Sequence, residues 1–335
     1  MARFIGVVSG KGGVGKTTVV SNLSYALNEL GQRVIAVDCN VTTPHLSNYM
    51  PNFSWRTTLN DVMKKKADIF SALHYANGVY VVPASLNLAD LVDVDITTLR
   101  ETVQPLANIN SLVLLDSAPG LGKEALSVLH SCEEILFVTI PQKSAVNDIL
   151  RCAEVAEEIG LKRLGLVLNM YRKKKYNLAQ EEIEEITGLK VIGNISFDEK
   201  VIQAISSRSP LVKSWPESKV SQEFMKLAAN LINIPYKRQG KISRMINRLF
   251  RRNQELTSRN YPILHTTNKD LTTAGDKILD LLAANKKMKI SEVAEKVNLS
   301  EEEIYKWGKI LEEQRLLSMQ PSIFGIKKSK LVWND

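Results

Sequence analysis

The sequence predicts an α/β protein built on a doubly wound, mostly parallel sheet, with a second, smaller domain after it. Short apolar runs alternate with helical patterns through residues 1–235, which is the order of a parallel sheet with crossover helices. Most of these runs are continuously apolar, as expected of strands that helices cover on both faces. A glycine-rich turn directly follows the first run, so a ligand-binding loop is expected at that strand end.

The expected strands follow in chain order at residues 4–8, 34–37, 79–82, 112–115, 135–139, 164–168 and 191–195. A last helix at 220–231 places Val220, Phe224, Leu227 and Leu231 on one face, which indicates ordinary core packing and closes the domain. Ligands of such sheets bind beyond the carboxyl ends of the strands. Polar residues at those ends are therefore candidate site residues.

Composition limits the class of protein. The chain of 335 residues suits one large and one small domain, and 44% hydrophobic content suits a buried core. The sequence has no apolar run of about 18 residues, so we expect no membrane-spanning helix. The N-terminal residues lack a signal-peptide layout. Cys39, Cys132 and Cys152 form no C-x-x-C pair, which argues against an iron–sulfur cluster. We therefore expect a cytoplasmic protein with reduced cysteines.

The turn after the first strand has the spacing G-x-x-x-x-G-K-[ST] of a phosphate-binding loop. Glycines let the backbone approach phosphate oxygens closely, and the following helix presents its positive end to them. Lys16 is expected on the β- and γ-phosphates, and the Thr17 hydroxyl on Mg²⁺. A glycine-rich turn without a ligand is the alternative. The predicted nucleotide-binding residues are Gly10, Lys11, Gly12, Gly13, Val14, Gly15, Lys16, Thr17 and Thr18.

Polar residues at three other strand ends complete the predicted site. Asp116 follows four apolar residues and is expected to hold Mg²⁺ through water, a weak signal alone but a strong one beside a phosphate loop. Asp38 ends the second strand, where a carboxylate has little structural use unless it serves a turn or a helix cap. Asn169 follows the sixth strand, and a plain turn residue is one interpretation of it.

The stretch KGGVGKTT, with its early lysine Lys11, resembles the deviant Walker A loop of the MinD/ParA family of ATPases. DSAPGLG at 116–122 resembles the second switch of that family, and VTIPQ at 138–142 its fifth-strand segment. The resemblance implies an ATPase that binds ATP and Mg²⁺ and forms a homodimer around two nucleotides, with Lys11 reaching the partner's nucleotide. It also implies that Asn169 contacts adenine. The sequence supports this role and the turn interpretation equally.

The first switch departs from the family pattern. The family strand end is D-x-D, and its second acid is held to orient the attacking water. This sequence has Asp38 and Asn40 in VDCN. An amide can hold water but accepts no proton, and phosphoryl transfer depends mainly on positioning and charge. We therefore expect slow hydrolysis and a long-lived ATP-bound dimer, with Lys11, Lys16, Asp38 and Asn40 as catalytic candidates.

Basic charge gathers in one segment. The net charge is +8, and residues 236–260 hold eight basic side chains against one acidic. Within 236–252 a helix would carry a basic face and one apolar stripe, formed by Ile242, Met245, Ile246, Leu249 and Phe250. This pattern is typical of an in-plane helix on an anionic membrane surface. Packing on the ATPase domain and binding to nucleic acid phosphates are alternatives, and the stripe favours the membrane.

Residues 253–273 read as a polar linker, and residues 274–335 resemble a winged helix-turn-helix domain. Ser291 is expected to cap its second helix, and Ser300 with Glu303 forms a capping box for the third. The third helix begins with three glutamates, Glu301 to Glu303, which DNA phosphates would repel. Contact with the DNA backbone stays an alternative, because the expected wing carries Lys327, Lys328 and Lys330. A protein partner or dimerisation is favoured over DNA.

These inferences combine into one hypothesis. The chain is expected to be a MinD-like ATPase that associates reversibly, as a peripheral protein, with membrane, for spatial positioning of cell-division or other machinery. The alternatives are a DNA-partitioning or regulatory ATPase of the ParA type, and a nucleotide-gated scaffold with negligible hydrolysis.

Overall fold

The computed structural model describes residues 2–50, 56–172 and 174–236. Beyond them it describes 278, 281–282, 285–297, 300–302, 304–305, 312, 317–321 and 328–333. The chain divides into two compact units, Met1–Gln239 and Gly240–Asp335, each described here by itself. The predicted membrane segment lies outside the described residues except for Tyr236, and so does the whole 253–273 linker.

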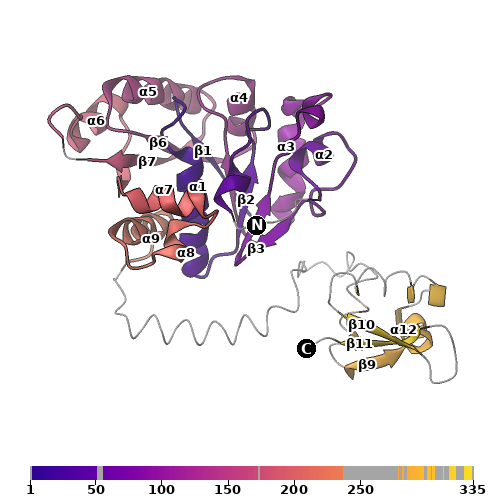
Figure 1. Cartoon of the computed structure of the whole chain (residues 1–335). Coiled ribbons are helices and arrows are strands. Elements are labelled where there is room, and N and C mark those ends of the chain that lie inside the picture. Colours follow the sequence, from indigo (N-terminus) through magenta and orange to yellow (C-terminus); the bar gives the residue numbers. More distant parts are fainter. Residues whose placement is uncertain are drawn as a thin grey trace. The chain divides into compact units, whose positions relative to one another are not determined.

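An eight-stranded sheet in the order β3-β4-β2-β5-β1-β6-β7-β8 forms the centre of the first unit (Figure 1). All neighbouring pairs are parallel except β3 with β4, which confirms the predicted doubly wound, mostly parallel sheet. The strands are β1 (Arg3–Val8), β2 (Val34–Asp38), β3 (His74–Ala76), β4 (Val79–Val82), β5 (Leu112–Asp116), β6 (Glu134–Thr139), β7 (Lys162–Tyr171) and β8 (Val191–Ser196).

All seven expected strands are present in this sheet, and β3 is its one strand that the sequence interpretation missed. It is a three-residue antiparallel strand at the edge of the sheet. Asn77 and Gly78 join it to β4, both with positive φ, at 52° and 110°. An Asn-Gly pair between strands is the common signal of a tight hairpin, so the sequence did contain evidence for this strand.

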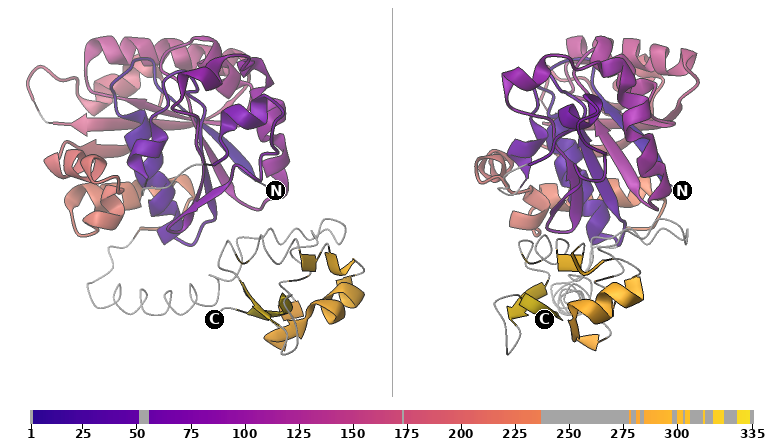
Figure 2. Two further views of the ribbon diagram at one scale, coloured as in Figure 1. Left: turned by 45° about the vertical axis from the view of Figure 1, so that its right-hand side comes forward. Right: turned by 90° about the vertical axis from the view of Figure 1, so that its right-hand side faces the viewer.

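Helices cover both faces of the sheet, because alternate strand residues point to opposite sides (Figures 1 and 2). Leu136 and Val138 belong to one core cluster with α1, α8 and α9, whereas Ile135 and Phe137 belong to another with α5 and α6. The helices are α1 (Lys16–Glu29), α2 (Leu59–Met63), α3 (Leu99–Val103), α4 (Lys123–Leu129), α5 (Lys143–Glu158), α6 (Gln180–Thr187), α7 (Glu199–Ser206), α8 (Leu211–Ser214) and α9 (Lys219–Leu231).

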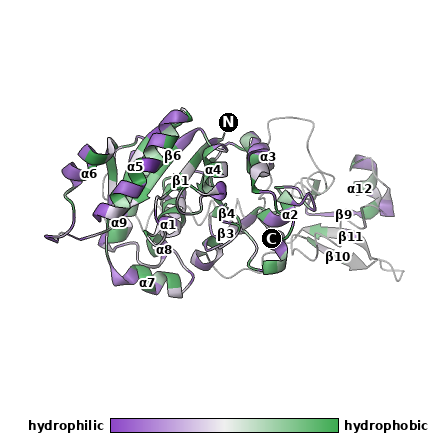
Figure 3. Ribbon diagram, turned by 90° about the horizontal axis from the view of Figure 1, so that it is seen from above, coloured by the Kyte–Doolittle hydropathy of each residue, from purple (hydrophilic) through white to green (hydrophobic). Residues whose placement is uncertain are grey.

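The amphipathic patterns of these helices agree with their positions. Figure 3 shows α5 with hydrophobic and hydrophilic bands along its length, as expected of a helix that covers a sheet with one side. The helix expected at 220–231 is α9, whose Val220, Phe224, Leu227 and Leu231 are all buried. It packs against α1 and β8 and so completes one face of the domain.

The described part of the second unit includes an antiparallel sheet in the order β10-β11-β9 and the helix α12 (Ile290–Val297). Its strands are β9 (Lys287–Lys289), β10 (Leu317–Pro321) and β11 (Lys328–Trp333). The expectation that Ser291 caps this helix is wrong, because α12 begins at Ile290 and encloses Ser291. The winged-helix assignment stays a prediction.

The packing of α9 can be tested with Phe224→Ala. Phe224 is 0% exposed, so the change removes a fully buried ring and leaves a cavity. We expect the free energy of unfolding to fall by about 3–5 kcal/mol in chemical denaturation. Lys226→Ala, on the exposed side of the same helix, should change it by less than about 0.5 kcal/mol. Equal losses in the two variants would contradict the packing described for α9.

Candidate functional site

The phosphate loop, residues 10–17, joins β1 to α1 and depends on glycine at several positions. Gly13 and Gly15 have φ of 79° and 82°, in the left-handed region where other residues are strained. A Cβ on Gly15 would also overlap the side-chain amide of Asn169, and one on Gly10 would overlap the backbone of Asp148 in α5. The loop therefore has the tight, glycine-dependent backbone that the motif predicts.

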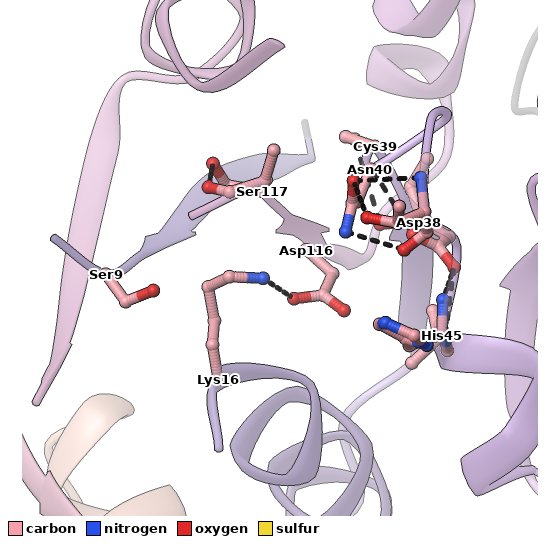
Figure 4. A network of polar contacts seen from close by, with 12 residues as sticks. Ser9, Lys16, Asp38, Cys39, Asn40, His45, Asp116 and Ser117 are labelled. Atoms are coloured by element: carbon pink, nitrogen blue, oxygen red, sulfur yellow. Dashed lines mark hydrogen bonds and ion pairs between the residues drawn. The ribbon is translucent and has the colours of Figure 1, made fainter. Parts of the chain in front are cut away.

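A buried ion pair lies directly beneath this loop (Figure 4). Lys16 is the first residue of α1, and its Nζ lies 2.5 Å from Oδ1 of Asp116 at the end of β5. The two side chains are only 7% and 1% exposed. Parallel pairing of β1 with β5 puts Val7 opposite Asp116, so this carboxylate is held beside the loop. The predicted phosphate lysine and the predicted Mg²⁺ carboxylate are thus in contact.

Asp38 lies on the adjacent strand and is fully buried. In the register of β2 with β5 it pairs with Asp116. Its carboxylate accepts backbone N–H bonds from Asn40 at 3.2 Å, His45 at 3.0 Å and Leu46 at 2.9 Å. Asp38 therefore holds the first switch loop, residues 39–46, which is the turn role that the sequence left open. Burial, and then the charge of Asp116, raise the pKa of Asp38 to about 7.

Asn40 is occupied by its own loop. Its Nδ2 donates to the Thr43 carbonyl at 2.7 Å, and its Oδ1 accepts from the Thr43 hydroxyl at 3.1 Å. The residue is 7% exposed. This Oδ1 also accepts from the Thr43 N–H at 3.4 Å, so both of its acceptor positions are taken and it has little capacity left to accept from a water molecule. In this conformation Asn40 stabilises the first switch loop, and a water-positioning role requires these bonds to open.

The first switch loop is also joined to α4, which the sequence did not predict. The backbone N–H and the hydroxyl of Thr42 both donate to Oε1 of Glu124, at 2.9 Å and 2.7 Å. The second switch, residues 116–122, is joined to the chain just before the phosphate loop, because the Gly120 N–H donates to the Ser9 carbonyl at 2.8 Å. No local pattern links Thr42 with Glu124, because the contact is purely tertiary.

Asn169 lies inside β7 rather than in a turn, so the turn interpretation is wrong. Its side chain is 4% exposed, and its Nδ2 donates to the Val14 carbonyl at 2.8 Å. This bond fastens the phosphate loop to β7, two strands away from β1 in the sheet. The adenine contact stays a prediction. Of the other loop residues, Lys11 is exposed, Thr17 is half-buried and Thr18 is buried.

The donor set fits a nucleotide phosphate with Mg²⁺. Glycines with positive φ followed by a helix start are the features of a backbone anion site, and Lys16 adds a cation there. Thr17 offers a hydroxyl, and Asp116 a carboxylate with the oxygen chemistry that Mg²⁺ prefers. These residues are the ones that would hold the phosphates and the ion.

The buried strand, glycine loop, lysine at the helix start and carboxylate on a neighbouring strand define a P-loop NTPase. The ParA family model, described as NUBPL iron-transfer P-loop NTPase, matches residues 1–232. An uncharacterised ATP-binding protein of Methanocaldococcus jannaschii is 32% identical, over 75% of this chain and 98% of the relative. The chain therefore belongs to the ParA/MinD family of P-loop NTPases.

Solved structures agree with this assignment. The cell division ATPase MinD of Pyrococcus furiosus has a TM-score of 0.68 and 34% identity, over 70% of this chain and 99% of that one. The septum site-determining protein MinD of Pyrococcus horikoshii, solved with Mg-ADP, has a TM-score of 0.67 and 33% identity, over 69% and 96%. Within the described residues, no helix has the length and apolar character needed to cross a membrane.

The shifted pKa of Asp38 predicts a pH effect on stability. Its pKa is about 7 in the folded chain and about 3.9 in an unfolded one. The contribution of Asp38 to stability is therefore fully present below about pH 4, and is lost as the pH rises through about 7. Between about pH 5 and pH 8 this group should lower the free energy of unfolding by on the order of 2 kcal/mol.

Denaturant titrations at both pH values can isolate this effect. In Asp38→Asn, the loss of stability between the two pH values should be smaller than in the parent by that amount. Glu182→Gln, an exposed acid of α6, should behave like the parent. A parent and an Asp38→Asn variant with the same pH dependence would contradict the raised pKa.

Proposed function

We propose that the chain is a MinD-like ATPase that binds ATP with Mg²⁺, forms a homodimer around two nucleotides and associates reversibly with an anionic membrane surface. The observation that carries this proposal is the contrast between the two loop lysines. Lys16 is buried against Asp116, whereas Lys11 is exposed and has no ion pair with any described residue. This contrast supports a role for Lys16 at the nucleotide of its own chain and a role for Lys11 at the nucleotide of a second chain.

The roles of the site residues follow from their positions. Lys16 and the loop backbone bind and orient the phosphates, Thr17 and Asp116 hold Mg²⁺, the latter through water, and Asn169 fixes the loop from β7. Bound Mg²⁺ would supply positive charge against the negative charge that develops on the phosphates. Asp38 keeps the first switch loop in place beside them. The relative solved with Mg-ADP supports this assignment.

In this proposal the nucleotide cycle controls membrane binding by the basic segment at 236–252. Two weak membrane anchors on one dimer bind far better than one, because the second binds at high effective concentration. Dimerisation on ATP would therefore recruit the protein to membrane, and hydrolysis would release it. Spatial positioning of cell-division or other machinery is the cellular role that this cycle fits. A protein partner of the 274–335 domain would connect the cycle to its cargo.

Hydrolysis is proposed to be slow, because Asn40 accepts no proton and its amide is bonded to Thr43. The same observation favours a second candidate, a nucleotide-gated scaffold with negligible hydrolysis. A DNA-partitioning ATPase of the ParA type is the remaining alternative, since nucleic acid phosphates also attract the basic segment. Iron transfer has less support, because all three cysteines are buried and the described residues include no group of three or more His, Cys, Asp or Glu side chains that could hold a metal ion.

Vesicle co-sedimentation tests the membrane proposal. We expect ATP to raise the fraction bound to phosphatidylglycerol vesicles several-fold over ADP or no nucleotide, and Ile246→Glu to remove most of that gain, because it places a charge in the apolar stripe. Asn247→Glu adds the same charge off the stripe and should keep most binding. Lys16→Ala should lose the response to ATP. Binding that ignores both nucleotide and Ile246→Glu would refute the proposal, and salt-sensitive DNA binding without vesicle binding would favour the ParA-type alternative.

Single-turnover hydrolysis tests the role of Asn40. Asn40→Asp restores a group that accepts a proton, so the rate should rise roughly tenfold or more. Asn48→Asp makes the same chemical change a few residues along the chain and should leave the rate within about twofold of the parent. An unchanged rate in Asn40→Asp would exclude Asn40 as the cause of slow turnover. ATP binding, measured separately, distinguishes that outcome from loss of the nucleotide site.

A further inference from the structure

The segment after β4 carries apolar side chains that the fold leaves uncovered. Leu86, Leu88 and Val92 are 62%, 78% and 62% exposed. No other stretch of seven residues in the described part of the chain holds three large apolar side chains with such exposure. Exposed apolar groups gathered in this way mark interaction sites more often than isolated ones do. We call residues 86–95 the acidic apolar surface.

The segment that forms this surface has regular turns and internal hydrogen bonds. It contains a 3₁₀ turn at Leu88–Leu91, with a second at Ile96–Thr98 directly after it. The hydroxyl of Ser85 donates to Asp90 at 2.6 Å, and the buried Asn60 of α2 accepts from the Ser85 N–H at 2.9 Å. Because these bonds fix the backbone, the apolar side chains are presented outward by the fold itself.

The charge of the surface identifies the chemistry of its partner. Residues 84–99 contain Asp90, Asp93 and Asp95 and no lysine or arginine. Asp93 and Asp95 are exposed beside the apolar side chains. Lys123 of α4 lies near enough to act on Asp95, but the three carboxylates outnumber it. Carboxylates in this position repel lipid and nucleic acid phosphates, which disfavours an anionic membrane or DNA as the occupant. A protein segment with basic groups around an apolar stripe complements both properties.

We propose that the acidic apolar surface is the docking site for a partner protein, which presents an amphipathic helix with an apolar stripe and basic flanks. Such a helix would bury the exposed leucines and pair its basic side chains with the aspartates. This proposal goes beyond the nucleotide and membrane cycle. It holds whether or not the chain hydrolyses ATP.

The position of the surface gives a bound partner access to the nucleotide loops. β4 runs parallel to β2, so the segment leaves the sheet at the same edge as the first switch loop. The 3₁₀ turn at 96–98 packs on α4, and Glu124 of α4 holds Thr42 of that loop. One helix therefore lies between the acidic apolar surface and the candidate site. A partner docked here is placed to sense or alter the first switch loop.

Fluorescence anisotropy with a designed probe tests the docking site on the full chain. The probe is a labelled helical peptide with leucines at i, i+3, i+4 and i+7 and lysines on both flanks. Its matched control replaces every lysine with glutamate. We expect the lysine peptide to bind at least about tenfold more tightly than the glutamate peptide, with an affinity that falls as salt rises. Equal binding of the two peptides, or no binding of the lysine peptide, would overturn the proposal.

Surface variants locate the bound peptide. Leu88→Ser should weaken binding about tenfold, because a buried leucine contributes strongly to such contacts. Asp93→Asn should weaken it about two- to fivefold; asparagine tolerates the positive φ of 65° at this position, so the backbone is kept. The controls Ile202→Ser, an exposed apolar residue of α7, and Glu182→Gln should stay within about twofold. Controls that weaken binding as much as Leu88→Ser would place the peptide elsewhere and refute the docking site.

Discussion

The candidate site depends on three buried titratable groups: the ammonium of Lys16 at the start of α1, and the carboxyl groups of Asp38 and Asp116 at the ends of the adjacent strands β2 and β5. Charges removed from water are costly unless each has a partner. Lys16 pairs with Asp116, and Asp38 is satisfied by three backbone N–H groups. Loss of Lys16 would leave two neighbouring carboxylates without their cation. The ends of β2 and β5, the start of α1 and the course of the first switch loop all serve to satisfy this cluster.

This arrangement divides the site into a fixed centre and a weaker rim. The central pair is almost fully buried, so water does not compete with it and its geometry is tightly held. The bonds at the rim, from Thr42 to Glu124, are exposed, and exposed polar contacts contribute little net stability. An incoming phosphate must compete with Asp116 for Lys16. The groups that can move at small cost in response are therefore those of the first switch loop.

The sequence predicted the features that depend on local pattern. The seven expected strands, most of them continuously apolar, are all present, and the spacing around Lys16 corresponds to a glycine loop with a buried lysine. It did not predict contacts between distant residues, such as Thr42 with Glu124, because no pattern within a window encodes them. Asn40 shows the same limit: its type was visible in the sequence, whereas its bonds to Thr43 depend on how Asp38 turns the loop. The exposure of Leu88 equally depends on which elements the fold leaves uncovered.

The chain carries two candidate interaction segments of opposite charge. Residues 236–260 are strongly basic, whereas residues 84–99 carry only acidic charge. Each also has apolar side chains, so the sign of the charge decides which partner each accepts. An anionic surface that attracts the first repels the second, and a basic protein helix does the reverse. The two segments therefore select partners of opposite charge. A nucleotide-driven protein with this division can present a basic segment to an anionic surface and an acidic one to a basic protein helix.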